Sequence, residues 1–466
     1  MHGTRVRSWL ALLLPWAMTG SSLAAAEPGS RPNVVVFLAD DLGYGDLGCY
    51  GHPRIKTPNL DAFAKQGVRL TECHSACPVC SPSRSAILTG RTPYRNGVYT
   101  WIAQDSEVHL RISETTLPKL LRQSGYTTAH VGKWHLNGKF NDPAQPQPGD
   151  HGYDYWLATQ NNAAPSHKNP TNFVRNGTPV GPLLGFSAPL VVGEAIDWLT
   201  HTRDKTRPFF LAVCTHEPHL PIETDPAYQG LYADLPADFR QHHGNVSQLD
   251  HEFGELMKTL DAQGLTGSTF VFFTSDNGPE GDGLKGRSRG STGGPRGRKR
   301  SLYEGGIHVP GIARWPGRII PGTTCDTPII GSDLFPTILG LCGVKPPTDR
   351  VIDGADVGLV LMGKTAVVDR PRPLYWRLDM APRQENLQMA LREGDWKLLA
   401  SLDYRHLELY NLKADPRETT DLKAGEPDRL IAMRKRLEAL NAEIEREGPD
   451  WWRRLNPDGG RPIAKR

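Results

Sequence analysis

The sequence predicts an α/β protein with a mainly parallel central sheet that is covered by helices on both faces. Short apolar, β-branched runs alternate with segments of helical spacing along most of the chain, and this alternation is typical of parallel sheets. The four clearest strands, at 34–39, 126–131, 209–214 and 270–274, each lead into polar residues. Because open α/β sheets bind ligands at the carboxyl ends of their strands, we expect one functional site built from four strand ends.

Hydrophobic spacing and turn residues place the elements in order. The run 34–39 is apolar throughout, as a strand buried on both faces must be, and it ends at Asp40-Asp41. Pro58 and Gly67 bound the first segment with helical spacing. The predicted helices of this part span 59–67, 83–88, 117–125, 191–201 and 248–263.

The pattern of predicted strands and helices changes near residue 365. The remaining residues contain short strand-like pieces and one charged helical segment, without the earlier alternation. These pieces lie at 371–376, 388–392, 396–400 and 407–412, and the helix lies at 429–447. We expect residues 27–365 to form a large domain and residues 366–466 a smaller α+β subdomain, in which the helix packs on an antiparallel sheet.

The first 26 residues resemble a targeting segment more than a part of the fold. Arg5 and Arg7 precede a short apolar stretch at 9–18, and three alanines at 24–26 offer a cleavage site. The apolar stretch is shorter than the roughly 20 residues that span a bilayer. Residues 1–26 are therefore predicted to be a signal peptide of an exported protein (periplasmic, secreted or lumenal) without stable membrane insertion.

Charge argues against a nucleic-acid-binding protein. The 466 residues carry a net charge of +3, and the signs are mixed along the chain. One Gly- and Arg-rich stretch, residues 285–300, contains no aromatic residue on which bases could stack. We interpret it as a loop that faces an anionic substrate; a plain solvated loop is the alternative.

The chain has seven cysteines, an odd number for an exported protein. One of them must stay unpaired or be consumed by other chemistry, and the other six could then form disulfides. Cys73, Cys77 and Cys80 have a spacing that could be read as a metal–thiolate cluster. The flanking Pro78 and Pro82 disfavour that interpretation.

The segment Cys80-Ser81-Pro82-Ser83-Arg84, continued by residues 86–91, resembles the maturation signature of the type I sulfatases. In that family the cysteine is oxidised to Cα-formylglycine by a formylglycine-generating or other sulfatase-maturing enzyme. The resemblance extends from about residue 32 to 422 and implies an alkaline-phosphatase-like fold, with 27–365 as the catalytic domain. The motifs are most similar to those of the N-acetylgalactosamine-6-sulfatase and arylsulfatase A group.

Two pairs of oxygen-bearing residues follow predicted strands, Asp40-Asp41 and Asp276-Asn277. Adjacent carboxylates are costly unless a cation or a helix N-terminus neutralises them. Either pair alone could be helix caps and a turn. The resemblance makes all four, with residue 80, ligands of a divalent metal; oxygen ligands suit Ca²⁺ or Mg²⁺ rather than zinc, and Ca²⁺ is the usual metal of the family.

Basic residues supply the remaining candidates. Lys133 and His135 are two apart, so an extended segment would direct both to one face. Prolines on both sides of His219 are expected to hold its backbone extended. The resemblance adds Lys299, four residues before the Tyr303-Glu304-Gly305-Gly306 motif.

The resemblance also implies roles for these residues. The hydrate of the formylglycine at position 80 would attack sulfur, and Arg84 would hold it. The metal, Lys133 and Lys299 would neutralise the sulfuryl oxygens. His219 would protonate the leaving oxygen, and His135 would take a proton from the hydrate to expel sulfate.

The implied activity is hydrolysis of a sulfate ester, with a sulfated saccharide as substrate. The segment 156–186 is expected to select it through groups such as Gln160, His167, Lys168 and Arg175. One alternative is a formylglycine-dependent phosphodiesterase or phosphonate hydrolase. Another is a non-catalytic protein that binds sulfated glycans, if Cys80 is not modified.

Overall fold

A computed structural model describes residues 31–281, 288–380 and 385–449. The predicted signal peptide, residues 1–26, and the tail from residue 451 lie outside the described residues. Within the described part, no helix combines the length and the apolar character that crossing a bilayer requires.

The central sheet has ten strands within the described residues. Its middle strands, β9-β1-β8-β4-β5, are all parallel, whereas β10, β6 and β7 run antiparallel to their neighbours. This confirms the mainly parallel sheet, with antiparallel strands that hydrophobic spacing did not predict. The order is β11 (Thr323–Cys325), β2 (Val68–Leu70), β10 (Gly311–Arg314), β9 (Thr269–Ser275), β1 (Asn33–Ala39), β8 (Phe209–Cys214), β4 (Thr127–Lys133), β5 (Tyr155–Thr159), β6 (Val174–Arg175) and β7 (Thr178–Pro179).

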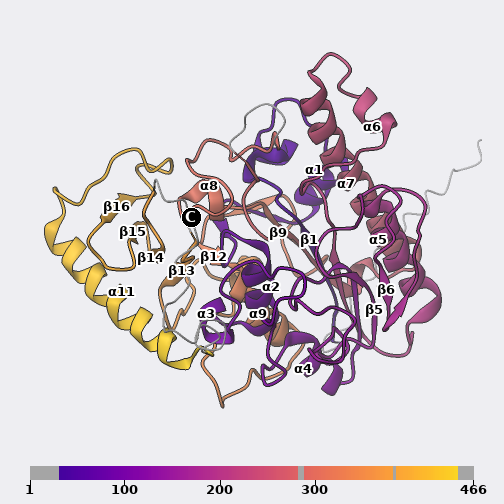
Figure 1. Ribbon diagram of the computed structural model, residues 1–466, viewed down its shortest axis with the longest axis horizontal. Coiled ribbons are helices and arrows are strands. Elements are labelled where there is room, and N and C mark those ends of the chain that lie inside the picture. Colours follow the sequence, from indigo (N-terminus) through magenta and orange to yellow (C-terminus); the bar gives the residue numbers. More distant parts are fainter. Residues whose placement is uncertain (1–30, 282–287, 381–384, 450–466) are drawn as a thin grey trace, which may run out of the picture.

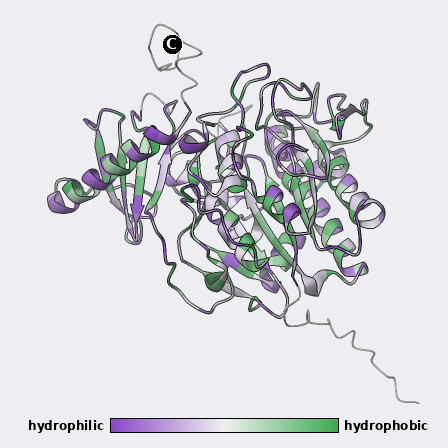
Figure 2. Cartoon of the chain, turned by 90° about the horizontal axis from the view of Figure 1, so that it is seen from below, coloured by the Kyte–Doolittle hydropathy of each residue, from purple (hydrophilic) through white to green (hydrophobic). Residues whose placement is uncertain are grey.

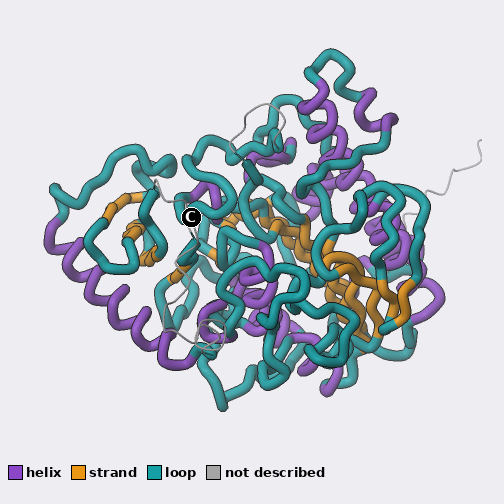
Figure 3. Tube along the Cα trace, viewed as in Figure 1, coloured by secondary structure: helices purple, strands orange, loops and turns teal. Residues whose placement is uncertain are grey.

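Helices cover both faces of this sheet (Figures 1 and 3). Alternate residues of β1 point to opposite faces, so that Val34 and Val36 join one hydrophobic core and Val35 and Phe37 join the other. The first core includes side chains of α2 (Cys80–Thr89), α4 (Leu117–Gln123) and α9 (Leu334–Leu341); the second includes α1 (Pro58–Gln66), α5 (Ser187–Asp197) and α7 (Ala237–Ala262). The remaining short elements are β3 (Cys73–His74), β12 (Ile329–Ile330), α3 (Pro93–Asn96), α6 (Pro226–Gly230), α8 (Glu304–Ile307) and α10 (Gly358–Leu361).

The largest difference from the predicted elements is the start of α7. The helix was expected at 248–263, but it begins at Ala237. Its first half is polar and yet buried: the Asn245 amide donates to the Glu223 carbonyl at 3.0 Å, and the Ser247 hydroxyl donates to the Lys56 carbonyl at 2.8 Å. Hydrophobic spacing does not detect a helix face that is buried through hydrogen bonds.

The C-terminal part is an α+β unit, as predicted. Four antiparallel strands in sequential order form its sheet: β13 (Leu374–Arg377), β14 (Met389–Glu393), β15 (Trp396–Ala400) and β16 (Leu407–Asn411). One face packs on α11 (Pro427–Glu447) through residues such as Met389 and Leu437. The other face packs through Trp376 and Leu399 against Tyr303 and Ile307 of the larger part. Figure 1 shows the four strands between α11 and the rest of the molecule, and Figure 2 shows hydrophilic residues along α11.

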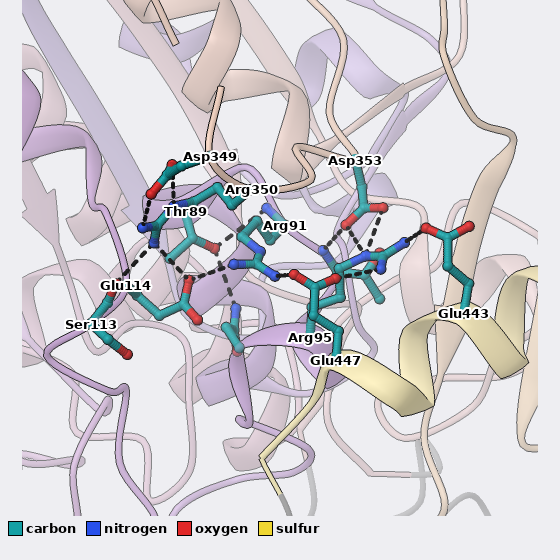
Figure 4. A network of polar contacts seen from close by, with 12 residues as sticks. Thr89, Arg91, Arg95, Ser113, Glu114, Asp349, Arg350, Asp353, Glu443 and Glu447 are labelled. Atoms are coloured by element: carbon teal, nitrogen blue, oxygen red, sulfur yellow. Dashed lines mark hydrogen bonds and ion pairs between the residues drawn. The ribbon is translucent and has the colours of Figure 1, made fainter. Parts of the chain in front are cut away.

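Ion pairs also connect α11 to the segment that follows α2 (Figure 4). Arg95, with a side chain only 1% exposed, contacts the carboxylates of Asp353, Glu443 and Glu447. Arg91 joins Glu447 to Glu114. The C-terminal helix therefore supports the region directly behind the Cys80 helix.

Candidate active site

Four strand ends meet at one place, as the sequence predicts. β1 ends at Asp40-Asp41, β9 at Asp276-Asn277, β4 at Lys133 and β8 before the turn that carries His219. The N-terminal residue of α2 is Cys80, and its sulfur lies within 4.8 Å of carboxylate oxygens of Asp40 and Asp276.

The oxygen-bearing residues form a buried cluster. Asp40, Asp41, Asp276 and Asn277 have no exposed surface. The Asn277 amide donates to Asp41 Oδ1 at 2.6 Å, and the Asp41 amide donates to Asp276 Oδ1 at 3.3 Å. Asp41 has a left-handed backbone, with φ 64°, which is uncommon for a residue other than glycine and is often found at functional sites.

The charges of this cluster fit a divalent cation. Burial would raise the pKa of Asp40, but Lys133, His219 and Arg84 hold it well below its ordinary range. Burial and the Asp40 carboxylate raise the pKa of Asp276 to about 7, so the positive side chains present do not neutralise the whole cluster.

Two oxygens are left for such a cation. Asp40 Oδ1 and Asn277 Oδ1 are buried and accept no hydrogen bond from the described residues. Buried oxygens without a donor are rare in proteins, and hard cations bind oxygen sets of this kind. The residues present therefore fit a Ca²⁺ or Mg²⁺ ion.

Three basic side chains surround the cluster. Lys133 Nζ lies 2.6 Å from Asp40, and Lys299 Nζ lies 2.7 Å from Asp41. Arg84 donates to Asp276 from Nε at 2.9 Å and to the Lys133 carbonyl from Nη1 at 2.9 Å. Burial acts to lower the pKa of the Lys299 ammonium, but the Asp41 carboxylate has the larger opposite effect. The pKa of Lys299 is therefore raised.

Cys80 is buried, with 3% of its surface exposed. Burial raises the pKa of its thiol, although Lys133 and Lys299 oppose this shift. The thiol is therefore protonated at neutral pH and is a weak nucleophile. None of the seven cysteines forms a disulfide; all of them lie in the described ranges.

The His135 ring has a defined tautomer. Its Nε2 lies 3.0 Å from the Ile102 carbonyl, which can only accept, so Nε2 carries the proton and Nδ1 the lone pair. Nδ1 is buried and has no partner among the described residues. Burial and Lys133 hold the pKa of His135 well below its ordinary range. This neutral ring can accept a proton at Nδ1.

His219 is the more accessible imidazole, with 15% of its side chain exposed. Its Nδ1 donates to the Leu220 carbonyl, and its Nε2 lies 3.6 Å from Asp41 Oδ2. Burial lowers the pKa of this ring to about 3; a bound anion would raise it.

The expectation of an extended backbone around His219 is wrong. The peptide bonds that precede Pro218 and Pro221 are both cis, and the His219 amide closes a turn on the His216 carbonyl at 2.9 Å.

Sequence reasoning missed the supports of His135 and Lys299. Gln160 accepts the His135 amide proton on its carbonyl at 2.7 Å, and its side-chain amide donates to the Ile102 carbonyl at 3.2 Å. Glu280 lies 3.5 Å from Lys299 Nζ and pairs with Arg300. No motif marks Gln160 or Ile102 for this role, because it depends on contacts between distant segments.

Some residues expected to select an anionic substrate have other partners. Arg175 forms a two-point ion pair with Glu194. The structure describes residues 288–300 of the stretch 285–300. Within them Arg289 pairs with Asp238, and Arg300 pairs with Glu280. These pairs lower the positive potential that the sequence predicts for the two segments.

Comparison with known proteins shows the family to which this sequence is similar. A sulfatase profile matches residues 32–344, and a profile for the C-terminal part of N-sulphoglucosamine sulphohydrolase matches residues 297–443. N-acetylgalactosamine-6-sulfatase of Rattus norvegicus is 37% identical over 417 residues, which are 83% of this chain and 74% of the relative. Arylsulfatase A of Homo sapiens is 32% identical over 477 residues, 91% and 90% of the two chains. The solved structure of the PsFucS1 sulfatase from Pseudoalteromonas sp. is 26% identical, with a TM-score of 0.74 over 90% of this chain and 92% of its own.

The sheet order, the helices on both faces and the polar strand ends define an enzyme of the alkaline-phosphatase-like fold. Within that class the chain belongs to the sulfatase family and is a sulfuric ester hydrolase. This confirms the family and the class of enzyme that the motifs predicted.

Proposed function

We propose that this protein is an exported sulfatase that removes sulfate from a saccharide, with residue 80 converted to Cα-formylglycine and a divalent metal held by Asp40, Asp41, Asp276 and Asn277. The observation that carries the proposal is the position of Cys80, at the start of α2 and within 4.8 Å of Asp40 and Asp276. A saccharide substrate is favoured because N-acetylgalactosamine-6-sulfatase is among the relatives. Ca²⁺ is the expected metal, and a formylglycine-generating or other sulfatase-maturing enzyme is the expected partner.

The surrounding residues have separate tasks. The aldehyde hydrate at position 80 would supply the nucleophile, and a metal held by Asp40, Asp41, Asp276 and Asn277 would supply positive charge. Lys133 and Lys299 stabilise negative charge on the sulfuryl oxygens. Arg84 fixes the loop of residue 80 through Asp276. His219, the more accessible of the two imidazoles, would protonate the leaving oxygen, and His135 Nδ1 would accept a proton on the buried side.

Two measurements test the proposal. Mass spectrometry of the peptide that contains residue 80, on protein from the native host, should show the loss of mass that accompanies conversion of the thiol to the aldehyde. Hydrolysis of an aryl sulfate should exceed that of an aryl phosphate diester. An intact thiol would favour the glycan-binding alternative, and the reverse preference would favour the phosphodiesterase alternative.

Metal removal should abolish most of the activity. Chelation is expected to lower kcat/KM for an aryl sulfate at least about 100-fold, because a bound cation supplies several kcal/mol of charge stabilisation. Ca²⁺ should restore the rate better than Mg²⁺, and Zn²⁺ should not restore it. Chelation should also lower the midpoint of thermal unfolding, since the cation binds the folded state. Equal activity with and without chelator would contradict the proposed site.

Replacing Gln160 tests the assignment of His135. In Gln160→Leu the carbonyl that holds His135 Nε2 loses its second donor, so the imidazole should be less well oriented. We expect kcat to fall about tenfold, the size typical of losing one positioning hydrogen bond of about 1 kcal/mol or slightly more. In the first turnover, release of the alcohol should outpace release of sulfate, because the loss affects the later step. Gln160→Glu keeps the size of the side chain, but an ionised carboxylate cannot donate to the Ile102 carbonyl, so this variant should not restore kcat. Gln123→Leu, on the exposed end of α4, should behave as wild type. Equal loss of both release rates would indicate a purely structural role.

A further inference from the structure

A pocket of about 390 Å³ lies outside the cluster of carboxylates and basic residues. Its volume is in the range of sites that hold small molecules, roughly 300–1,000 Å³. Three segments form its wall: residues 104–105, residues 138–142, and the segment after β5 that contains Gln160 and Asn172. The last segment is the one in which the sequence predicts substrate selection.

Two hydrogen-bonded routes connect this pocket to the candidate active site. Gln160 lines the pocket, and its carbonyl accepts the His135 amide proton. Asn172 also lines it and donates to the Asn162 carbonyl at 2.9 Å. Asn162 in turn donates at 3.2 Å to the carbonyl of Leu220, the residue after the candidate acid. The two routes end at the backbone of His135 and at the residue that follows His219. We infer that a sugar joined to the sulfated residue extends from the candidate active site into this pocket.

The lining of the pocket is polar but carries little positive charge. The side-chain amides of Gln104 and Asn141 form no hydrogen bond with other residues of the described ranges, so both are available to a ligand. Asp105 and Asp142 place two carboxylates on the wall, against the single ammonium of Lys139. Lys139 also pairs with Glu107 at 2.5 Å.

This chemistry selects against anions. Amides and carboxylates accept and donate the hydrogen bonds that sugar hydroxyls need, whereas a second sulfate or a uronic acid would meet like charge. We propose that the pocket is a subsite for an uncharged, hydroxyl-rich sugar residue next to the sulfated residue. The inference rests on the proposed function and narrows its substrate class.

Inhibition of aryl sulfate hydrolysis by saccharides tests this subsite. The sulfated residue has an uncharged neighbour in κ-carrageenan oligosaccharides and in keratan sulfate oligosaccharides that carry one sulfate per disaccharide. It has an anionic neighbour in ι-carrageenan and chondroitin 6-sulfate oligosaccharides. We expect the first group to inhibit at about tenfold lower concentration, a difference of about 1.4 kcal/mol. The double variant Asp105→Asn/Asp142→Asn removes the two carboxylates from the wall of the pocket. It should lose this preference and hydrolyse the aryl sulfate as wild type does. The control Gln123→Ala should keep both properties.

Three results would overturn the proposal: equal inhibition by the two groups, stronger inhibition by the second group, or no inhibition by any saccharide. Calorimetric titration of the same oligosaccharides into the Cys80→Ala protein makes the comparison without turnover. If oligosaccharides of the two groups bind equally well in that titration, the result argues against the proposed subsite and leaves the proposed function untouched. Absence of aryl sulfate hydrolysis in wild-type protein argues against the proposed function instead.

Discussion

The Cys80→Ala variant is expected to lose kcat/KM for an aryl sulfate by roughly 10⁴-fold or more, the scale seen when a nucleophile is removed from an enzyme. The thiol is buried beside Asp40 and Asp276 and is protonated at neutral pH. The chemistry at this position is therefore expected to depend on modification of the side chain, and alanine cannot be modified. Initial rates and the midpoint of thermal unfolding, measured together, check the prediction.

The matched control is Cys49→Ala. Cys49 is partly exposed, precedes the signature and lies outside the cluster. It should retain near-normal rates. A Cys80→Ala protein with wild-type activity would rule out residue 80 as the source of the nucleophile. If Cys80→Ala fails to fold, the same measurements are made on Cys80→Ser, because serine is closer to cysteine in shape.

The second large effect is expected at the contact between the two parts of the fold. Lys397 of β15 is fully buried, and its Nζ lies 2.7 Å from Glu304 and 2.9 Å from Glu418. Lys397→Met would leave two buried carboxylates without this cation, and breaking a buried ion pair in this way typically costs about 3–5 kcal/mol. Urea denaturation at pH 8 should show a lower free energy of unfolding by that amount.

The loss should depend on pH with a definite sign. Burial raises the pKa of Glu418 to about 7 even with Lys397 present. Burial also acts to raise the pKa of Glu304, but Lys397 and His74 hold it well below its ordinary value. Removing the lysine would raise the pKa of both carboxyl groups. A raised carboxyl pKa in the folded state means that protons bind this state more tightly, so stability is regained as the pH falls. The deficit of Lys397→Met should therefore be smaller at pH 5 than at pH 8. Equal deficits at the two pH values would contradict this account.

Lys413→Met is the control for this prediction. Lys413 is exposed and lies in the same C-terminal unit. Its replacement should change the free energy of unfolding by no more than about 0.5 kcal/mol. The comparison separates loss of a buried cation from loss of any lysine.

The elements that the sequence predicts well are those with a simple hydrophobic pattern. β1, β8 and β9 are apolar at nearly every position, and the structure places them within one residue of the predicted bounds. β6, β7 and β10 were missed because they are short, and the pairing of short strands depends on neighbours from distant parts of the chain. The buried polar start of α7 was missed because its partners lie on other segments.

By itself the sequence determined the class of fold, the membership of the family and the residues that gather at the strand ends. These features are local: apolar runs specify buried strands, and the motif of Cys80 to Arg84 is contiguous. The tertiary structure decided the tautomer of His135, the neutralisation of Arg175 by Glu194, the support of Lys299 by Glu280 and the pocket beside Gln160. Each of these depends on the distance between groups far apart in the chain, and folding alone sets that distance.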